Sequence, residues 1–331
     1  MTFDKSVVVP LDPDATFDLV TQPDRLRRWM TVAARVDLRA GGGYRWTVTP
    51  GHHAAGTIVE VDPGKRVVYT FGWEEDADLP PGASTVTVTL TPVDAGTEVR
   101  LVHEGLTDEQ AAHHAVGWNH FMDRLVAAGR DGDAGPDEWA AAPDPLDELL
   151  CAEATLAVLQ NVLVGLDSSD LARQTPCSEY TVAQLADHLL TGMTRIGTAA
   201  GAQMPQRDLD AALETQVAEA AEAVLEAWRR KGVEGTVELA STQLPATAAV
   251  GILSVEFLVH AWDFAMATDR RVVVSETVCD YVQGLVAKII TPQLRPGRFA
   301  DPVTASADID AFGRLIAFTG RQPAVVQTSA N

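Results

Sequence analysis

Positively charged residues are scarce in this sequence. Lysine and arginine number 25 in 331 residues, against 46 aspartate and glutamate residues, so the formal net charge at pH 7 is −21. The excess is spread along the chain, with 22 acidic and 12 basic residues up to Ala140 and 24 and 13 after it. Such a surface repels nucleic acid and anionic membranes. Neither is therefore expected as a partner, and high solubility is the general consequence.

Cysteine is scarce as well. The three cysteines, Cys151, Cys177 and Cys279, are odd in number and far apart. This spacing argues against a disulfide framework or a paired-cysteine metal site, and it favours a reducing compartment. The N-terminus lacks a basic start followed by an apolar core, and no apolar run is long enough to cross a bilayer. We therefore expect a cytoplasmic protein without a membrane span.

The first half of the chain has the alternating pattern of β-strands. Residues 85–91 read TVTVTLT, and another strand is expected at Thr97–His103 after the turn Asp94–Gly96. Other expected strands are Ser6–Val9, Thr57–Val61 and Arg66–Trp73, and expected helices are Asp14–Thr21, Arg25–Met30 and Asp108–Gly129. This order predicts an α+β domain over residues 1–130. Its long last helix crosses a curved antiparallel sheet, an arrangement that usually encloses a cavity.

A segment rich in Gly, Asp, Ala and Pro predicts a linker at residues 131–145, and the periodicity then becomes helical. The pattern Thr181-Val-Ala-Gln184 is a capping box that marks the start of one helix. The expected helices are Leu146–Leu166, Thr181–Ala199, Leu209–Lys231, Thr247–Thr268, Ser275–Ile290 and Ala307–Phe318. Helices of this length joined by modest loops predict an all-α bundle domain over residues 146–331.

One of these helices carries ionisable groups in apolar surroundings. Residues 250–267 read VGILSVEFLVHAWDFAMA, with Glu256, His260 and Asp263 as the ionisable residues. A carboxylate on a buried helix requires a partner or a cation. Glu256 and His260 are four residues apart and share a face. Asp263 is expected to orient His260 through its second ring nitrogen.

A third ligand is expected from His188, which stands on an apolar helix face in the second half. Two histidines and one carboxylate suit a divalent ion with an open position, most simply zinc. The alternatives are a helix-stabilising Glu–His pair and a core histidine. Cys177 precedes the His188 helix and has no neighbouring histidine in sequence, so a structural role is favoured over a nucleophilic one.

Three segments of the second half form a distinctive set of motifs: TPCSEYTVAQLADHL (Thr175–Leu189), VEFLVHAWDFAMAT (Val255–Thr268) and FTGRQP (Phe318–Pro323). Through them, roughly residues 146–325 resemble the DinB-like, mycothiol-dependent maleylpyruvate isomerase superfamily. Tyr180 stands where tryptophan is commoner in that pattern. The resemblance implies a helical bundle whose divalent metal is held by His188, Glu256 and His260. It also implies a low-molecular-weight thiol such as mycothiol as co-substrate.

The first half resembles the START/SRPBCC superfamily, in its heat-shock ATPase activator-like branch. The resemblance spans about residues 1–130 through Val7–Trp29, Gly41–Pro50, Gly56–Trp73, Gly96–Asp108 and Gly117–Trp118. It implies a helix-grip fold and an apolar ligand cavity. Candidate lining residues are Trp29, Trp46, Tyr69, Trp73, Trp118 and Phe121, for which core packing is the alternative.

The remaining histidines of the first half lack a convincing carboxylate partner in sequence. His103 and Glu104 end a strand, where they either face the cavity mouth or, as we favour, form a polar pair. His52 and His53 are interpreted as part of a hairpin loop. No metal is therefore expected in this half.

The leading hypothesis from sequence is a metal-dependent enzyme, a thiol-dependent isomerase or S-transferase that acts on a small organic substrate and carries a START-like module. The alternative is a non-catalytic small-molecule-binding or stress-response protein with a structural metal site. Co-activation of a chaperone is a third hypothesis. The substrate and the oligomeric state are left open.

Overall fold

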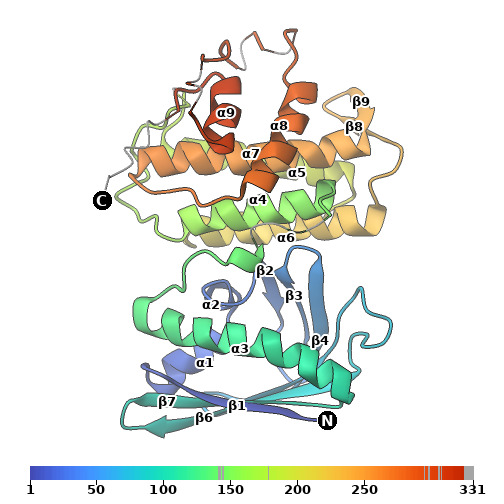
Figure 1. Ribbon diagram of the computed structural model, residues 1–331, viewed down its shortest axis with the longest axis vertical. Coiled ribbons are helices and arrows are strands. Elements are labelled where there is room, and N and C mark those ends of the chain that lie inside the picture. The colour runs from blue at the N-terminus through green and yellow to red at the C-terminus, as the bar shows by residue number, and fades with distance from the viewer. Residues whose placement is uncertain are drawn as a thin grey trace. The chain divides into compact units, whose positions relative to one another are not determined.

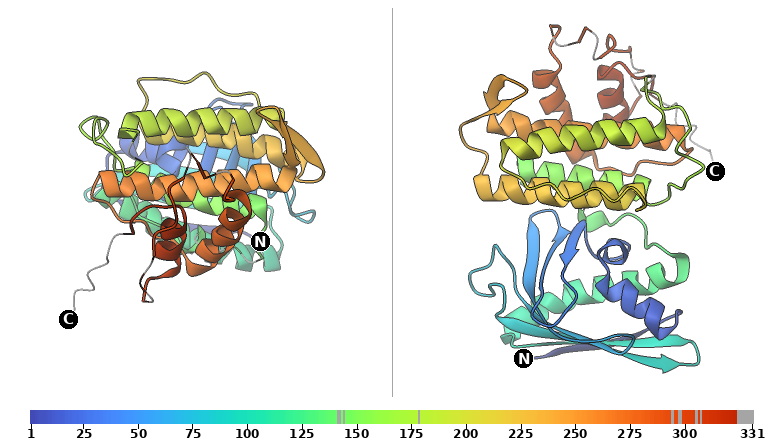
Figure 2. Two further views of the ribbon diagram at one scale, coloured as in Figure 1. Left: turned by 90° about the horizontal axis from the view of Figure 1, so that it is seen from above. Right: turned by 180° about the vertical axis from the view of Figure 1, so that it is seen from behind.

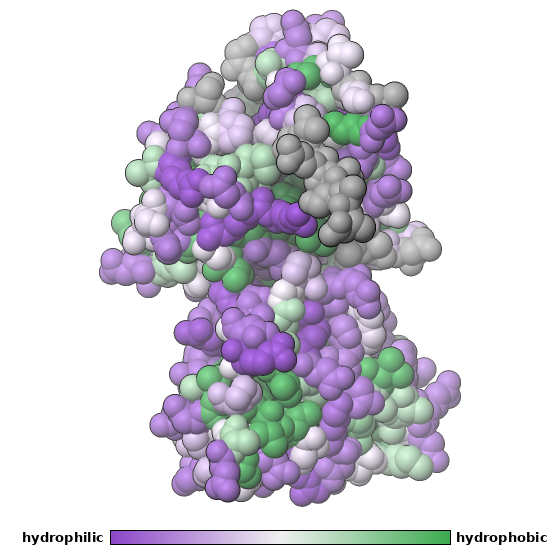
Figure 3. Space-filling model, turned by 60° about the vertical axis from the view of Figure 1, so that its left-hand side comes forward, coloured by the Kyte–Doolittle hydropathy of each residue, from purple (hydrophilic) through white to green (hydrophobic). Residues whose placement is uncertain are grey.

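The computed structural model describes residues 1–140, 143, 145–177, 179–293, 295–296, 299–304, 306 and 308–323. The chain forms two compact units, Met1–Asp137 and Glu138–Asn331 (Figures 1 and 2). Hydrophilic residues cover most of the face drawn in Figure 3, as the acidic composition predicts.

The first unit is built on a seven-stranded antiparallel sheet in the order β1-β7-β6-β5-β4-β3-β2. Consecutive strands pair from β2 to β7, and β1 pairs with β7 at the edge. The strands are β1 (Phe3–Val9), β2 (Ala33–Val36), β3 (Gly43–Thr49), β4 (His52–Asp62), β5 (Arg66–Phe71), β6 (Ser84–Val93) and β7 (Gly96–Glu104). The short helices α1 (Pro13–Thr21) and α2 (Pro23–Leu26) connect β1 to β2.

Helix α3 (Asp108–Asp131) lies across one face of this sheet (Figure 1). Thr107 and Gln110 form a capping box at its start, and Gly132 ends it in the left-handed conformation at φ 85°. Trp118, Phe121 and Leu125 of α3 pack into the same buried apolar cluster as the inner side chains of the strands. The helix-grip arrangement predicted from the sequence is therefore present.

Three details of the first unit differ from the prediction. Strands β2 and β3 were not predicted, and β4 begins at His52, so His52 and His53 stand on a strand and not in a hairpin loop. The predicted strand Thr57–Val61 is thus the second half of β4, and a bulge between Ile58 and Glu60 interrupts its regular alternation. Residues 132–137 of the predicted linker pack against the first unit, where the Ala134 N–H donates to the Arg28 carbonyl at 2.9 Å.

The second unit is a helical bundle in which each of α4, α5, α6 and α7 packs against two of the others. Figure 2 shows these four helices side by side, with α8 and α9 outside them. After the short turn η1 (Glu138–Ala140), the helices are α4 (Glu148–Leu163), α5 (Val182–Ala199), α6 (Leu213–Lys231), α7 (Ala246–Ala267), α8 (Glu276–Ile289) and α9 (Ala311–Phe318). Helix α9 begins after Ala307, which is not among the described residues.

Helix α7 is the central element of the bundle and packs against α4, α5 and α8. By length and composition it could cross a membrane, but 83% of its most apolar window is buried inside the unit. Its apolar character is therefore that of a core helix, as expected of a helix that is apolar nearly all round.

The second unit also contains a short hairpin, which corrects the all-α prediction. Strands β8 (Thr236–Leu239) and β9 (Thr242–Pro245) pair antiparallel. Ala240 and Ser241 form the turn with φ values of 49° and 66°. Two-residue hairpin turns of this kind usually carry Asn or Gly, so the sequence lacked the signal that predicts one.

Candidate metal centre

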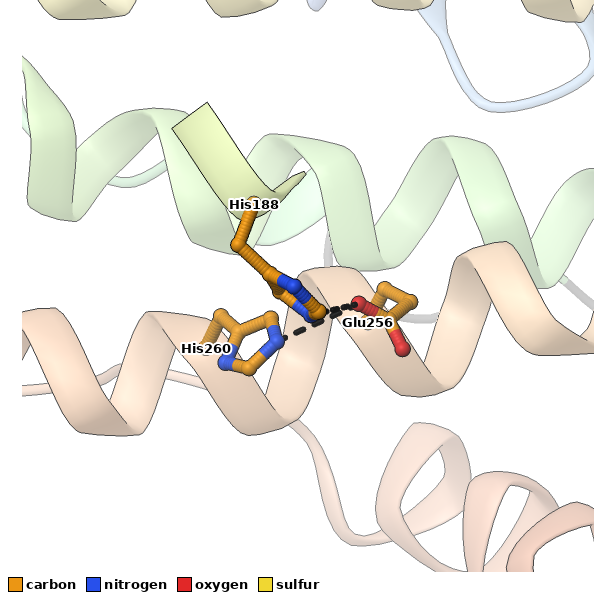
Figure 4. A group of neighbouring side chains, drawn as sticks. All are labelled: His188, Glu256 and His260. Carbon is orange, nitrogen blue, oxygen red and sulfur yellow. Dashed lines mark hydrogen bonds and ion pairs between the residues drawn. The ribbon is translucent and has the colours of Figure 1, made fainter. Parts of the chain in front are cut away.

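Helices α5 and α7 bring together the three residues that the sequence predicts as metal ligands. The Thr181 side chain accepts from the Gln184 N–H, and the Gln184 side chain accepts from the Thr181 N–H. This capping box begins α5 so that His188 lies in its second turn. Glu256 and His260 lie one turn apart on α7. Figure 4 shows all three side chains converging on one point between the two helices.

The distances within this group fit a divalent ion. Glu256 Oε2 lies 3.6 Å from His188 Nε2 and 3.2 Å from His260 Nε2. The three ligand atoms lie within 4.8 Å of one another. Bonds of about 2.0–2.1 Å in a tetrahedral zinc site separate neighbouring ligand atoms by about 3.4 Å. The two measured separations bracket that value, so this donor set can hold such an ion with small side-chain adjustments.

The electrostatics of the group couple the carboxylate to the two imidazoles. Burial raises the pKa of Glu256, but hydrogen bonds to His188 and His260 outweigh burial and hold the pKa well below its usual range. Burial lowers the pKa of His260, whereas Asp263 and Glu256 raise it, with a net pKa of about 9. At neutral pH Glu256 is therefore ionised, as a metal ligand must be, whereas His260 carries a proton that it would release on binding an ion through Nε2.

Asp263 lies behind His260, on the side away from Glu256. His260 Nδ1 is 2.9 Å from Asp263 Oδ2, and Asp263 is fully buried. With Nδ1 hydrogen-bonded to a carboxylate, His260 directs its Nε2 toward Glu256 and His188. This is the orienting role that the sequence assigned to Asp263.

One side of the group is accessible to solvent. The exposed fraction of the side chain is 42% for His188, 25% for Glu256 and 8% for His260. On α5, one turn after His188, Gly192 also lies beside the carboxylate, where a Cβ would make an ordinary contact at 4.0 Å with Glu256 Oε2. Among the described residues, the group contains three candidate ligands. Small molecules in the solvent can therefore reach this side of the group.

The loop before α5 contributes Tyr180, whose ring packs against the exposed His188. Tyr180 stacks on His188 with ring centroids 5.2 Å apart and an angle of 26° between the rings. The loop folds back on itself, since the Thr175 hydroxyl donates to the Tyr180 carbonyl at 2.8 Å. Burial and the negative charge of Asp263 raise the pKa of the Cys177 thiol in this loop. Cys177 is therefore poorly suited to act as a nucleophile.

Sequence reasoning missed Arg321, which completes the buried side of the group. Its Nε and Nη2 donate to the two carboxylate oxygens of Asp263 at 2.8 and 2.7 Å. The two residues are 58 positions apart, so no spacing rule connects them. Arg321 belongs to the FTGRQP segment, whose sequence alone does not indicate that this side chain reaches Asp263.

The predicted cavity of the first unit is nearly filled by side chains. It retains a volume of about 10 Å³, enough for about one water molecule. Of the six predicted lining residues, Trp29, Trp46 and Tyr69 line it. Trp118 and Phe121 are buried in the apolar core, and Trp73 is partly buried against it. Five of the six residues are therefore buried, and three of them line a small void within the core.

His103 and Glu104 do not form a polar pair at the strand end. His103 is fully buried, its Nε2 lies 2.8 Å from Ser84 Oγ, and its Nδ1 accepts from Trp118 Nε1 at 3.1 Å. Glu104 is exposed. The alternation of β7 directs His103 into the core and Glu104 outward.

His53 has carboxylate neighbours that its sequence surroundings did not reveal. His53, Glu74 and Glu75 form a second group with metal-ligand geometry, and His53 Nδ1 contacts Glu75. Glu74 is already paired with Arg45, which donates to both of its oxygens at 2.8 and 2.6 Å. The guanidinium of Arg45 thus supplies positive charge beside this group, which the prediction of no metal in this half did not foresee.

Comparisons with known proteins match parts of this chain. Residues 10–129 match the family model of Activator of Hsp90 ATPase homolog 1-like protein. Two uncharacterized proteins from strains of Mycobacterium tuberculosis are 26% identical over 179 residues, 53% of this chain and 98% of theirs. A match of 179 residues is longer than Met1–Asp137, so it extends into the second unit.

Solved structures also resemble part of the chain. The AHSA1-like protein of Rhizobium etli is 34% identical, with 44% of this chain and 88% of that chain covered and a TM-score of 0.34. The AHSA1-like protein of Aeromonas hydrophila is 21% identical, with 40% and 94% covered and a TM-score of 0.34. The family model and the observed sheet and long helix agree. The first unit therefore has the AHSA1-like fold of the START/SRPBCC superfamily.

Proposed function

We propose that the second unit is a metal-dependent catalytic domain in which His188, Glu256 and His260 hold a divalent ion, most simply zinc. The observation that carries the proposal is the convergence of these three side chains with separations of 3.6 and 3.2 Å between ligand atoms. The accessible side of the group distinguishes it from closed structural zinc sites, which have four protein ligands. We further propose that the protein acts in the cytoplasm, in keeping with its few cysteines.

The reaction class we propose is thiol-dependent isomerisation or S-transfer on a small organic substrate. A divalent ion with an open position favours deprotonation of a thiol near neutral pH. The chain's own residues have three tasks in this scheme. Glu256 supplies negative charge, Asp263 keeps the imidazole of His260 directed inward, and the partly exposed side of His188 and Gly192 admits substrate. A low-molecular-weight thiol such as mycothiol is the proposed co-substrate.

The test of the metal centre is the metal content of the purified protein. We expect about one zinc ion per chain in the wild type, as a single three-ligand site predicts, and almost none in His260→Ala or Glu256→Gln. His113→Ala is the matched control, because His113 is an exposed histidine of the first unit and outside the group. Equal zinc in the wild type and in His260→Ala would refute the proposed centre.

The test of the reaction is thiol-dependent turnover of electrophilic small molecules. Activity should require both the thiol and the metal, disappear on chelation, and return when Zn²⁺ is added. If the protein binds zinc through His260 but turns over no substrate with any cellular thiol, the metal site is supported and the enzymatic function is refuted.

One observation favours a second candidate function for the first unit. Its cavity of about 10 Å³ is too small for an organic ligand. We propose, as the alternative, that this unit binds a partner protein and that the whole chain is a non-catalytic stress-response protein. Titration with apolar dyes distinguishes the two. Saturable binding that Trp29→Ala weakens would favour a ligand cavity that opens in solution, whereas absence of binding would favour a partner protein.

A further inference from the structure

Arg321, near the C-terminal end of the described residues, contacts Asp263 on the buried side of the proposed metal centre. Asp263 is fully buried and receives three hydrogen bonds, two from Arg321 and one from His260. Arg321 is itself largely buried, with 12% of its side chain exposed. A fork of two parallel hydrogen bonds fixes the position and plane of a carboxylate better than a single bond does.

The backbone before Arg321 is shaped to present it. The Arg321 N–H donates to the Ile316 carbonyl at 3.3 Å, and the Gly320 N–H donates to the Ala317 carbonyl at 3.0 Å. These two bonds form a Schellman motif, the common end of a helix with glycine in the left-handed conformation. Gly320 has φ 88°, and a Cβ at this position would lie 2.7 Å from the Ala300 carbonyl oxygen. Glycine is therefore required for the turn that brings Arg321 toward Asp263.

We infer that Arg321 is a positioning residue of the metal centre, which acts on the ion through Asp263 and His260. The inference rests on the proposed metal function. Arg321 holds the Asp263 carboxylate, Asp263 holds the Nδ1 side of the His260 ring, and the Nε2 atom of that ring is thereby directed toward the ion. Residues that orient a metal-bound histidine typically contribute about 10- to 100-fold to metal affinity.

The first measurement is the affinity of the full-length chain for Zn²⁺, obtained by competition with a chromogenic chelator. Arg321→Gln should weaken binding by about 10- to 100-fold. Arg321→Lys should recover only part of the loss, because an ammonium group cannot form the two-bond fork. Binding of Zn²⁺ by Arg321→Gln with wild-type affinity would overturn the inference.

A matched control separates positioning from general destabilisation. Arg229 of α6 is also a largely buried arginine of the second unit, and it pairs with the buried Glu153 of α4. Arg229→Gln should lower the free energy of unfolding and leave Zn²⁺ affinity within about threefold of the wild type, because α6 supplies none of the three candidate ligands. An equal loss of affinity in both variants would mean that Arg321 acts only through stability.

A double-mutant cycle tests the route through Asp263. Asp263→Asn alone should weaken Zn²⁺ binding, and adding Arg321→Gln to it should cause little further loss, because residues that act in series are not additive. The double variant also removes both members of a buried charge pair, which limits the cost to folding. Fully additive losses would overturn the route through Asp263.

The outcomes distinguish this inference from the proposed function. If the wild type binds Zn²⁺ through His260 but Arg321 has no effect, only the positioning role is overturned. If the wild type shows no binding that depends on His260, the metal centre itself is overturned, and the positioning role with it.

Discussion

His103 is a buried histidine in the core of the first unit, and its protonation is linked to folding. Burial, together with the neighbouring His114, lowers the pKa of His103 to about 3. The neutral imidazole accepts from Trp118 at Nδ1 and faces Ser84 Oγ at Nε2. A proton on Nδ1 would break the hydrogen bond from Trp118 and place a charge in the apolar core. The folded state therefore resists protonation of this ring.

We expect acid to destabilise the first unit through His103. In the unfolded chain the histidine pKa is about 6.5, so the unfolded state binds the proton first. The free energy of unfolding should decrease as pH falls below about 6.5, by up to about 1.4 kcal/mol per pH unit, and the decrease should end only near pH 3. Urea unfolding of the wild type and of His103→Asn at pH 7.0, 5.5 and 4.5 would measure it. If the free energy of unfolding changed equally with pH in the wild type and in His103→Asn, the prediction would be contradicted.

At the scale of single residues, the candidate ligands could be predicted because ionisable side chains interrupt an otherwise apolar helical pattern. Glu256, His260 and Asp263 stand among apolar side chains on α7, whereas the side chain of His188 on α5 is 42% exposed. A buried ionisable group requires a partner, so each such residue indicates a site. Arg321 gave no comparable signal, because arginine near the end of a chain is ordinarily exposed.

At the scale of elements, helices were predicted more completely than strands. Helices α4 to α8 begin and end within a few residues of the predicted positions, because their apolar periodicity extends over many turns and several have side-chain caps. Strands β2 and β3 are four and seven residues long, and their register depends on neighbouring strands. Short segments of this kind carry too little pattern to be recognised alone.

The β8–β9 hairpin offers a direct test of backbone strain. Ala240 and Ser241 adopt positive φ values of 49° and 66°, which cost residues with a Cβ about 1–2 kcal/mol each. Replacing the pair with Ala240→Asn and Ser241→Gly matches the residue preference of this turn. We expect the free energy of unfolding of the second unit to rise by about 1 kcal/mol, measured by urea unfolding.

The control for this prediction is Ser275→Gly, a substitution outside the hairpin at the N-cap of α8. It should lower stability by a few tenths of a kcal/mol. A hairpin variant that is no more stable than the wild type would show that contacts around the turn already compensate for the strain.

At the scale of the whole molecule, the chain consists of two units that each have a core. The apolar cluster of the first unit lies within Met1–Asp137, and α7 forms the centre of the second. Units with separate cores can unfold separately. A ligand that binds one folded unit therefore stabilises that unit and leaves the other unchanged.

Zinc should accordingly shift one of two thermal transitions. At a free concentration 100 times its Kd, Zn²⁺ should add about 2.7 kcal/mol to the free energy of unfolding of the second unit. Differential scanning calorimetry with and without Zn²⁺ would detect the shift. His260→Ala should abolish it, and the transition of the first unit should not move. A shift of both transitions by equal amounts would be incompatible with a site confined to the second unit.

The amino-acid sequence by itself determined the two-part organisation, the order of the helices and the identity of the candidate ligands. It did so because periodicity and isolated ionisable groups are local properties of the chain. Tertiary structure alone decided that the aromatic residues of the first unit fill its interior, that Glu74 and Glu75 lie beside His53, and that Arg321 reaches Asp263. These are contacts between residues distant in sequence, and their formation depends on how whole elements pack.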